Sequence, residues 1–247
     1  MTPLAAALAL VIGASLGLVG GGGSILTVPA LVYAVGFAPR DAIVASLLVV
    51  GVAALAGAYV HWRLGTLDLA VAAWFGGLGA VGAWAGARLG RLVPGAWLMV
   101  GFAVIAVAAG LTLMSPRGIP VSRGARRHWS VVASTALGVG FLTGLLGLGG
   151  GFIIVPALAL VLGLPMARAV GTSLAVIAIN CAAALTTAAA GLAADRALVT
   201  AVFAALALAG TLVGARTASR ARPELLRRAF GVLVLGVGLY TGAAAVV

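Results

Sequence analysis

Two glycine runs are the residues of this chain whose spacing could do chemistry. Gly20–Gly23 precede Ser24, Gly149–Gly151 precede Phe152, and an apolar stretch follows each run. A helix that begins after such a break points unpaired N–H groups at it and carries about half a positive charge there. Because glycine has no Cβ, a ligand can also approach this backbone closely. The two runs therefore predict a site for a small anion, such as an oxyanion or a carboxylate.

Polar side chains in the next apolar segments could complete the hydrogen-bond shell of that anion. Ser46 occupies the same place in the first half of the chain as Ser173 does in the second, and Thr172 adjoins Ser173. Asn180 lies seven residues beyond Ser173, on the same face of a helix. The alternative is that these hydroxyl and amide groups only hold neighbouring helices together.

Two prolines follow the glycine runs at matching distances. Pro29 and Pro156 each free a carbonyl group one turn earlier, which could face a cavity, or they only kink the helix. We therefore expect the substrate-binding residues to be Gly20, Gly21, Gly22, Gly23, Ser24, Pro29, Ser46, Gly147, Gly149, Gly150, Gly151, Phe152, Pro156, Thr172, Ser173 and Asn180.

Close helix packing is the competing explanation of the glycines. Gly76, Gly79, Gly82, Gly86 and Gly90 recur at spacings of three and four, which is typical of a packing face. Consecutive glycines, in contrast, destabilise a helix by about 1 kcal/mol each relative to alanine. A packing face does not need them, so we interpret the two runs as breaks at a site.

The remaining ionisable residues favour no other chemistry. Asp41, Asp68, Asp195 and Glu224 fall at the ends of apolar segments, whereas a proton relay usually needs an ionisable group at membrane depth. An inside-negative potential drives an anion outward with about 2.3 kcal/mol per 100 mV, so export needs no coupling ion. We expect no enzyme activity, no metal and no cofactor, because no nucleophile with a base and no ligand set lies at depth. His61, Trp62 and Arg63 are expected to anchor a helix at the membrane interface.

The elements that hold these residues are membrane helices. Of the 247 residues, 64% are apolar and 8% charged, and the mean hydropathy is +1.26. A soluble domain is about one quarter charged. The fifteen basic residues are all arginine and lie between apolar segments, so the net charge of +11 is not a nucleic-acid footprint. The sequence predicts an all-α polytopic membrane protein and excludes a soluble enzyme or a disordered chain.

A tandem repeat organises these segments. GLVGGGGSILTVPAL at residues 17–31 aligns with GLLGLGGGFIIVPAL at 144–158, and 9 of the 15 positions are identical. We expect a first transmembrane repeat at 1–114, an arginine-rich cytoplasmic linker at 115–130 and a second repeat at 131–247. The expected apolar segments are 4–36, 42–60, 69–87 and 97–114, then 131–164, 169–190, 197–215 and 229–246.

Two topologies are compatible with these segments. Residues 4–36 would form a helix of about 50 Å, which is too long for one crossing. If each broken segment re-enters and returns, eleven arginines share the linker side and four lie opposite; if it crosses once, the division is nine to six. The first division follows the positive-inside rule better. It predicts inverted repeats, each with a glycine-broken re-entrant helix pair and three transmembrane helices.

The paired glycine and Val-Pro-Ala-Leu stretches resemble the TauE/SafE sulfite exporter family, also called the toluenesulfonate uptake permeases. The resemblance covers essentially the whole chain, although the first copy has Gly21 where the second has Leu148, and Ser24 where it has Gly151. It implies a multi-pass permease of the plasma (inner) membrane for sulfite, sulfonates or other organic anions, without a prosthetic group.

We therefore expect a permease that exports sulfite or a small organosulfonate through a central site between the repeats, driven by the membrane potential. An anion channel, or an uptake permease for another small organic anion, is the alternative. The expected partners are the anion and the lipid bilayer, with no nucleic acid. The oligomeric state stays open, a homodimer included.

Overall fold

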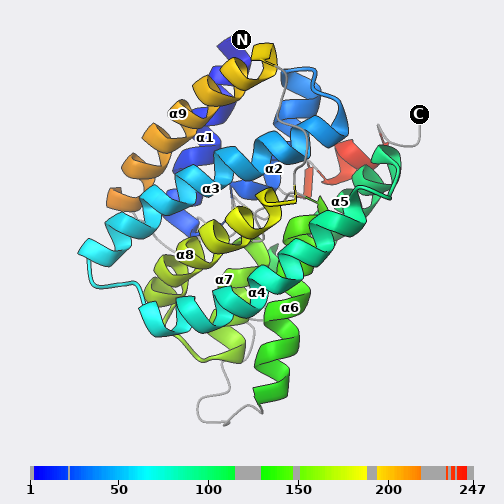
Figure 1. The fold of residues 1–247 in the computed structure, drawn as a ribbon. Helices are drawn as coiled ribbons and strands as arrows, with labels where there is room; N and C mark the ends of the chain where they lie inside the picture. The colour runs from blue at the N-terminus through cyan, green and yellow to red at the C-terminus, as the bar shows by residue number, and fades with distance from the viewer. Residues whose placement is uncertain are drawn as a thin grey trace.

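The structure, a computed structural model, describes residues 3–21, 23–114, 129–146, 151–187, 194–217, 232, 235–236 and 238–243. Within them the chain is helical and contains no strand, as Figure 1 shows. The helices are α1 (Pro3–Val19), α2 (Ser24–Pro29), the π-helix η1 (Ala30–Ala34), α3 (Pro39–Arg63), α4 (Leu69–Gly90), α5 (Gly95–Met114), α6 (Trp129–Leu146), α7 (Gly151–Val161), α8 (Met166–Leu185) and α9 (Ala194–Thr217).

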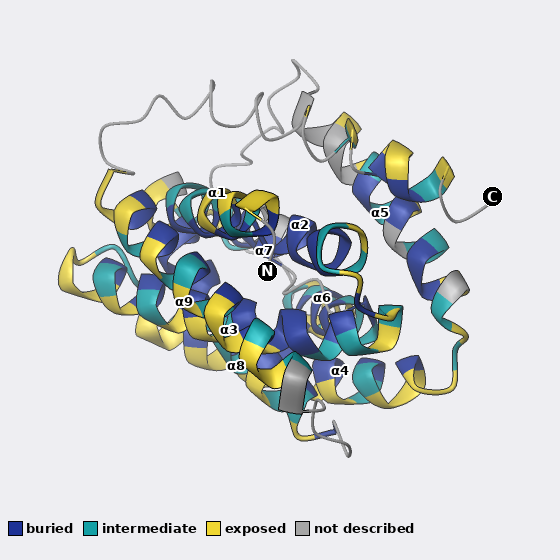
Figure 2. Cartoon of the chain, turned by 90° about the horizontal axis from the view of Figure 1, so that it is seen from above, coloured by how far each residue is buried: buried dark blue, intermediate teal, exposed yellow. Residues whose placement is uncertain are grey.

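Five of the described helices, α3, α4, α6, α8 and α9, are long and apolar enough to cross a membrane. Their outer faces carry large apolar side chains in the open, among them Leu55, Trp74, Val81 and Leu198. Figure 2 shows exposed residues along the outside of the helices and buried residues turned towards the interior. Such apolar exposure marks a surface that another apolar phase covers. The chain is a multi-pass membrane protein.

The helix break expected at the first glycine run is present. α1 ends at Val19, Gly20 has a φ of 75°, and α2 begins at Ser24. α1 has 17 residues, which give about 25 Å, less than the apolar core of a bilayer. In the second half α6 ends at Leu146 and α7 begins at Gly151. Gly147, Gly149 and Gly150, like Gly22, lie outside the described residues, and so does the linker up to residue 128.

Close backbone contacts join the halves of the chain. α1 runs beside α9 in the same direction, with Gly13 against Ala207 and Gly17 against Thr211. α4 runs beside α6 in the same way. A Cβ added to Gly82 or Gly86 would overlap the backbone of α6. Glycine therefore lets these helices touch, as the spacing in α4 predicts.

α3 and α8 cross in opposite directions. Gly51 lies against Cys181, and Gly57, six residues later, lies against Leu174, seven residues earlier. Figure 1 shows the two helices running side by side. This pair forms the middle of the structure, because α3 also packs on α9 and α8 also packs on α4.

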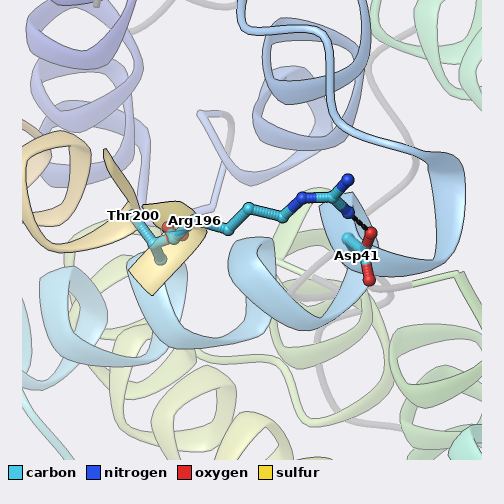
Figure 3. Close-up of polar contacts among 3 residues, drawn as sticks. All are labelled: Asp41, Arg196 and Thr200. Atoms are coloured by element: carbon cyan, nitrogen blue, oxygen red, sulfur yellow. Dashed lines mark hydrogen bonds and ion pairs between the residues drawn. The ribbon is translucent and has the colours of Figure 1, made fainter. Parts of the chain in front are cut away.

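Polar contacts tie the starts of α3 and α9 together at one end of the structure. Arg196 forms an ion pair with Asp41, and both side chains are 38% exposed (Figure 3). The hydroxyl of Thr200 donates to the carbonyl oxygen of Arg196 at 2.7 Å. At the same end, Nη2 of Arg40 lies 3.4 Å from the carbonyl oxygen of Arg91, after α4.

At the opposite end, the connection between α3 and α4 is held by α8. The backbone N–H of Asp68 donates to Oγ1 of Thr172 at 3.0 Å, and Asp68 in turn caps α4 by accepting from the N–H of Val71. The rings of Trp74 and Trp129 meet here edge to face, with centroids 5.8 Å apart. These contacts bring the starts of α4, α6 and α8 to one end.

Candidate functional site

The first helix break lies directly on α8. The hydroxyl of Ser173 donates to the carbonyl oxygen of Gly20 and is also 2.7 Å from that of Val170. A Cβ on Gly20 would lie 2.8 Å from Cα of Val170, and the positive φ disfavours a side chain as well. Ser173 is predicted to line the site. Its hydroxyl contacts the backbone of the first break.

The two glycine runs, which come from different halves of the chain, meet in space. The backbones of Gly21 and Gly151 touch, and a Cβ on either residue would overlap the other. Gly151 is the first residue of α7, and Ser24 is the first residue of α2. The hydroxyl of Ser24 donates to the carbonyl oxygen of Gly21 at 2.7 Å. The structure thus brings the start of α7 to the break that precedes α2.

Close packing alone could also explain why glycine occupies the described positions of the two breaks. A Cβ on Gly23 would overlap the carbonyl oxygen of Ile12 in α1. A Cβ on Gly20 would lie 2.8 Å from atoms of Val170, and a Cβ on Gly21 or Gly151 would overlap the other glycine. A bulky substitution at these positions would therefore test folding as much as ligand binding.

One face of α8 lies along the breaks. Ser173, Ile177 and Asn180 follow at helical spacing and lie next to Gly20, Gly151 and Gly79, respectively. Asn180 is fully buried, and neither Oδ1 nor Nδ2 has a hydrogen-bond partner among the described residues. A Cβ on Gly79 would lie 2.7 Å from Oδ1. An unpaired buried polar group costs about 1–3 kcal/mol, so this carboxamide favours a polar guest.

The other predicted polar residues bond within the protein. The hydroxyl of Ser46 donates to the carbonyl oxygen of Ile43 at 2.8 Å, and Thr172 accepts from Asp68. Because α3 and α8 are antiparallel, Ser46 and Ser173 lie towards opposite ends of the crossing, on the order of 20 Å apart along the helices. The structure does not bring the two serines together.

The predicted prolines lie in the second half-helices. Pro29 is buried and ends α2, and the π-turn η1 follows it. Because proline has no backbone N–H, Pro29 cannot donate the i→i−4 hydrogen bond of an α-helix. This is a physical reason for the change from α-helix to π-helix. Phe152 and Pro156 lie within α7.

His61 departs from the expectation that it anchors at an interface. Its side chain is 4% exposed, whereas that of Trp62 is 53% exposed and that of Arg63 is also exposed. Nδ1 of His61 is 2.8 Å from Oγ1 of Thr66, and the imidazole also lies beside the backbone of Gly17 in α1. A Cβ on Gly171 of α8 would lie 3.0 Å from Cβ of His61. The residue therefore lies in the protein interior, at the junction of α3 with α8.

A signal for this burial exists in the sequence. The small residues Ala54, Gly57 and Ala58 precede His61 at spacings of three and four and are buried with it. They define a face that packs against another helix. α3 also extends to Arg63, three residues beyond the expected end at residue 60, which carries this face through His61.

Comparisons with known proteins agree with this architecture. The family model described as sulfite exporter TauE/SafE matches residues 5–241. A "probable membrane transporter protein" of Xylella fastidiosa strain Temecula1 is 34% identical over 242 residues, which cover 93% of this chain and 90% of that protein. The "probable membrane transporter protein YdhB" of Bacillus subtilis strain 168 is 26% identical over 172 residues, which cover 67% of this chain and 70% of that protein. No solved structure matches the chain.

Proposed function

The chain belongs to the TauE/SafE sulfite exporter family of membrane transporters, and we propose that it exports sulfite or a small organosulfonate anion. The proposed site lies between the two halves, where the glycine breaks meet α8. The proposed location is the plasma (inner) membrane. The family supplies the class of transporter, and the residues at the breaks supply the reason for an anion.

The observation that carries the proposed site is the carboxamide of Asn180. It is buried on the face of α8 that contacts both breaks, and no hydrogen-bond partner for it occurs in the part of the chain that the structure describes. Nδ2 offers two N–H donors without adding a charge, which suits an anion that must also be released. Gly151, the first residue of α7, lies against Ile177, one turn before Asn180, and the first N–H groups of a helix can bind an anion.

The contacts at the two ends of the structure support inverted repeats with re-entrant helix pairs. If each broken segment crossed the membrane once, the starts of α3 and α9 would lie on opposite sides. Asp41 and Arg196 nevertheless form an ion pair. Thr172 and Asp68 would also be separated, yet they share a hydrogen bond. α3 and α8 occupy corresponding places in the two halves and run antiparallel. This course agrees with repeats related by a pseudo-two-fold symmetry axis in the membrane plane.

The proposed driving force is the membrane potential. Among the described side chains, the carboxylates are those of Asp41, in an ion pair, and Asp68, at a helix cap. Both lie at helix starts rather than at membrane depth, so they favour no proton relay. A negative charge that leaves a cell with an inside-negative potential gains about 2.3 kcal/mol per 100 mV.

The experiment is flux of labelled sulfite and sulfoacetate in proteoliposomes with an imposed potential of either sign. We expect flux that follows the potential without a pH gradient. Flux that saturates and exchanges with unlabelled substrate identifies a carrier, and flux without these properties identifies the alternative, a channel. A strict requirement for a proton gradient would contradict the proposed driving force, and uptake against the expected direction would favour an importer.

Asn180→Leu tests the site in the same assay. A hydrogen bond to a charged group contributes about 1.5–3 kcal/mol, so we expect substrate affinity to fall about 10- to 100-fold. Thermal stability should be unchanged or higher, because an unpaired buried amide is removed. The control is Thr200→Val, which removes a buried hydroxyl of α9 that bonds only the carbonyl of Arg196 in the described hydrogen bonds. Equal transport by Asn180→Leu and the parent protein would reject the site.

A further inference from the structure

A cavity of about 140 Å³ lies where four membrane helices begin or end. Its lining includes Arg40 and Ile43 from the start of α3, Arg91 after the end of α4, Leu145 from the end of α6 and Thr187 after α8. Aliphatic side chains and glycine backbone make up most of the wall. The volume can hold several water molecules or a small organic anion.

The charged groups of this cavity are two guanidinium groups. Arg40 is exposed, and its Nη2 lies 3.4 Å from the carbonyl oxygen of Arg91 and 3.5 Å from that of Val93, beside the end of α4. The carboxylate nearest in sequence, Asp41, is paired with Arg196 and does not neutralise Arg40. The described lining residues include no carboxylate.

The partial charges of the helix ends around the cavity show why the two arginines are needed for anion binding. α4, α6 and α8 end here, and the C-terminal end of a helix carries about half a negative charge, whereas α3 and α5 begin here with about half a positive charge each. The helix ends therefore give the cavity no excess of positive charge, and the charge that binds an anion comes from the guanidinium groups. Arginine presents two parallel N–H groups to a carboxylate or sulfonate, which a simple ammonium group cannot.

The cavity is lined in part by the end of α6, the helix that precedes the second glycine run in the sequence. Gly144 and Leu145, which line it, belong to the last turn of α6, and α6 ends at Leu146. It lies at the end of the structure that carries the Asp41–Arg196 ion pair. An anion bound here would lie between that end and the meeting point of the breaks.

We propose that this cavity is a second anion site, a vestibule that binds small organic anions with an apolar body. The inference rests on the proposed function. Arg40 and Arg91 bind the anionic head, and the aliphatic wall buries the body, which contributes about 25 cal/mol for each Å² removed from water. Sulfite has no apolar body, so the vestibule favours organosulfonates over sulfite.

The test measures flux and binding of propanesulfonate and sulfite for Arg91→Gln, Arg40→Gln and the double variant in neutral-lipid proteoliposomes. We expect Arg91→Gln to raise KM for propanesulfonate about tenfold, which corresponds to one charge-assisted hydrogen bond. Maximal flux should change little, and KM for sulfite should change less. Arg91→Gln keeps the backbone carbonyl that Arg40 binds, so it preserves the local fold.

Arg88→Gln is the matched control. Arg88 is on the same helix, but its guanidinium stacks on the ring of Trp84 at 4.5 Å and does not line the cavity. We expect it to transport propanesulfonate as the parent protein does.

Binding is also measured by thermal stabilisation of the detergent-solubilised protein with propanesulfonate, which does not depend on flux. Parent KM and parent stabilisation in all three arginine variants would overturn the vestibule while leaving the proposed function intact. An effect seen only when anionic lipid is added would overturn it in favour of a lipid headgroup. The parent protein could be stabilised by propanesulfonate, and lose this stabilisation in Arg91→Gln, while it transports no anion. This result would support the vestibule and overturn the proposed function.

Discussion

At the scale of single residues, Asn180 differs from the other polar side chains near the breaks. The hydroxyls of Ser24, Ser46 and Ser173 all donate to backbone carbonyl oxygens. A hydroxyl that is already bonded in this way stabilises the helix and offers less to a ligand. The carboxamide of Asn180 has no such bond within the described residues, and Gly79 of α4 lies beside it across the helix interface. The space that Gly79 leaves is therefore part of the proposed site.

Gly79→Ala tests this space. The added Cβ would lie 2.7 Å from Oδ1 of Asn180 and 3.0 Å from Nδ2, so the amide must shift. We expect a KM for the transported anion about tenfold higher, as for one displaced hydrogen bond to a charged group, with the protein still folded. The measurement is flux in proteoliposomes beside the melting temperature in detergent.

Gly77→Ala is the control for Gly79→Ala. Gly77 is exposed on the same helix, and nothing lies within 4 Å of an added Cβ. Both substitutions gain similar helix propensity, so a difference between them reports the contact with Asn180. Identical KM values for the two variants would remove Gly79 from the site.

At the scale of elements, glycine decides which helices can touch. α4 packs on α6, and α1 packs on α9, through contacts in which glycine lies against a backbone carbonyl. Between apolar helices in lipid, association depends on such close packing and not on a difference in hydrophobicity. The same residue type therefore has two roles here: it breaks helices at the runs and joins helices elsewhere.

Gly140→Ala tests the joining role. A Cβ on Gly140 in α6 would overlap the carbonyl oxygen of Gly79 in α4, so the helices must move apart. Overpacking of this kind costs about 1–3 kcal/mol, and we expect a lower melting temperature in detergent. Gly138→Ala, on the exposed side of the same helix with nothing within 4 Å, should melt at or above the parent temperature. A stable Gly140→Ala protein would show that the α4–α6 contact tolerates separation.

At the scale of the whole molecule, the polar contacts separate into two ends. Asp41, Arg196 and Arg40 lie at one end, and Asp68 and Thr172 at the other. This division is what a re-entrant, inverted topology requires, because the broken segments then return to the side from which they came. The broken helices and Asn180 lie between the two ends.

Single cysteines test the topology. In a Cys181→Ala background, we expect Leu64→Cys and Ala167→Cys to react with an impermeant maleimide from the cytoplasmic side, and Ala38→Cys from the other side. All three positions are exposed at helix ends. If each broken segment crossed once, Ala38 and Ala167 would share a side and Leu64 would lie opposite. Labelling of cells and of inverted vesicles distinguishes the two patterns.

Local physics in the sequence predicts much of this protein. Segment hydropathy predicts the membrane helices, since burial in lipid needs no knowledge of partners. The cost of consecutive glycines predicts the break after Val19. The expected ends of α4 and α5 lie within three residues of the observed ones, at residues 69 and 87 against 69 and 90, and at 97 and 114 against 95 and 114.

Other features depend on how helices that are distant in sequence cross. The burial of His61 follows from the contact of α3 with α8, and the separation of Ser46 from Ser173 follows from their antiparallel course. The meeting of Gly21 with Gly151 and the position of the exposed residues Arg40 and Arg91 at one cavity also need the tertiary arrangement. By itself the sequence determined where the chain is helical, where it breaks and that it lies in a membrane, because these depend on neighbours within a few turns. Only the tertiary structure decided which polar groups are paired and which remain available, because pairing depends on the packing of whole helices.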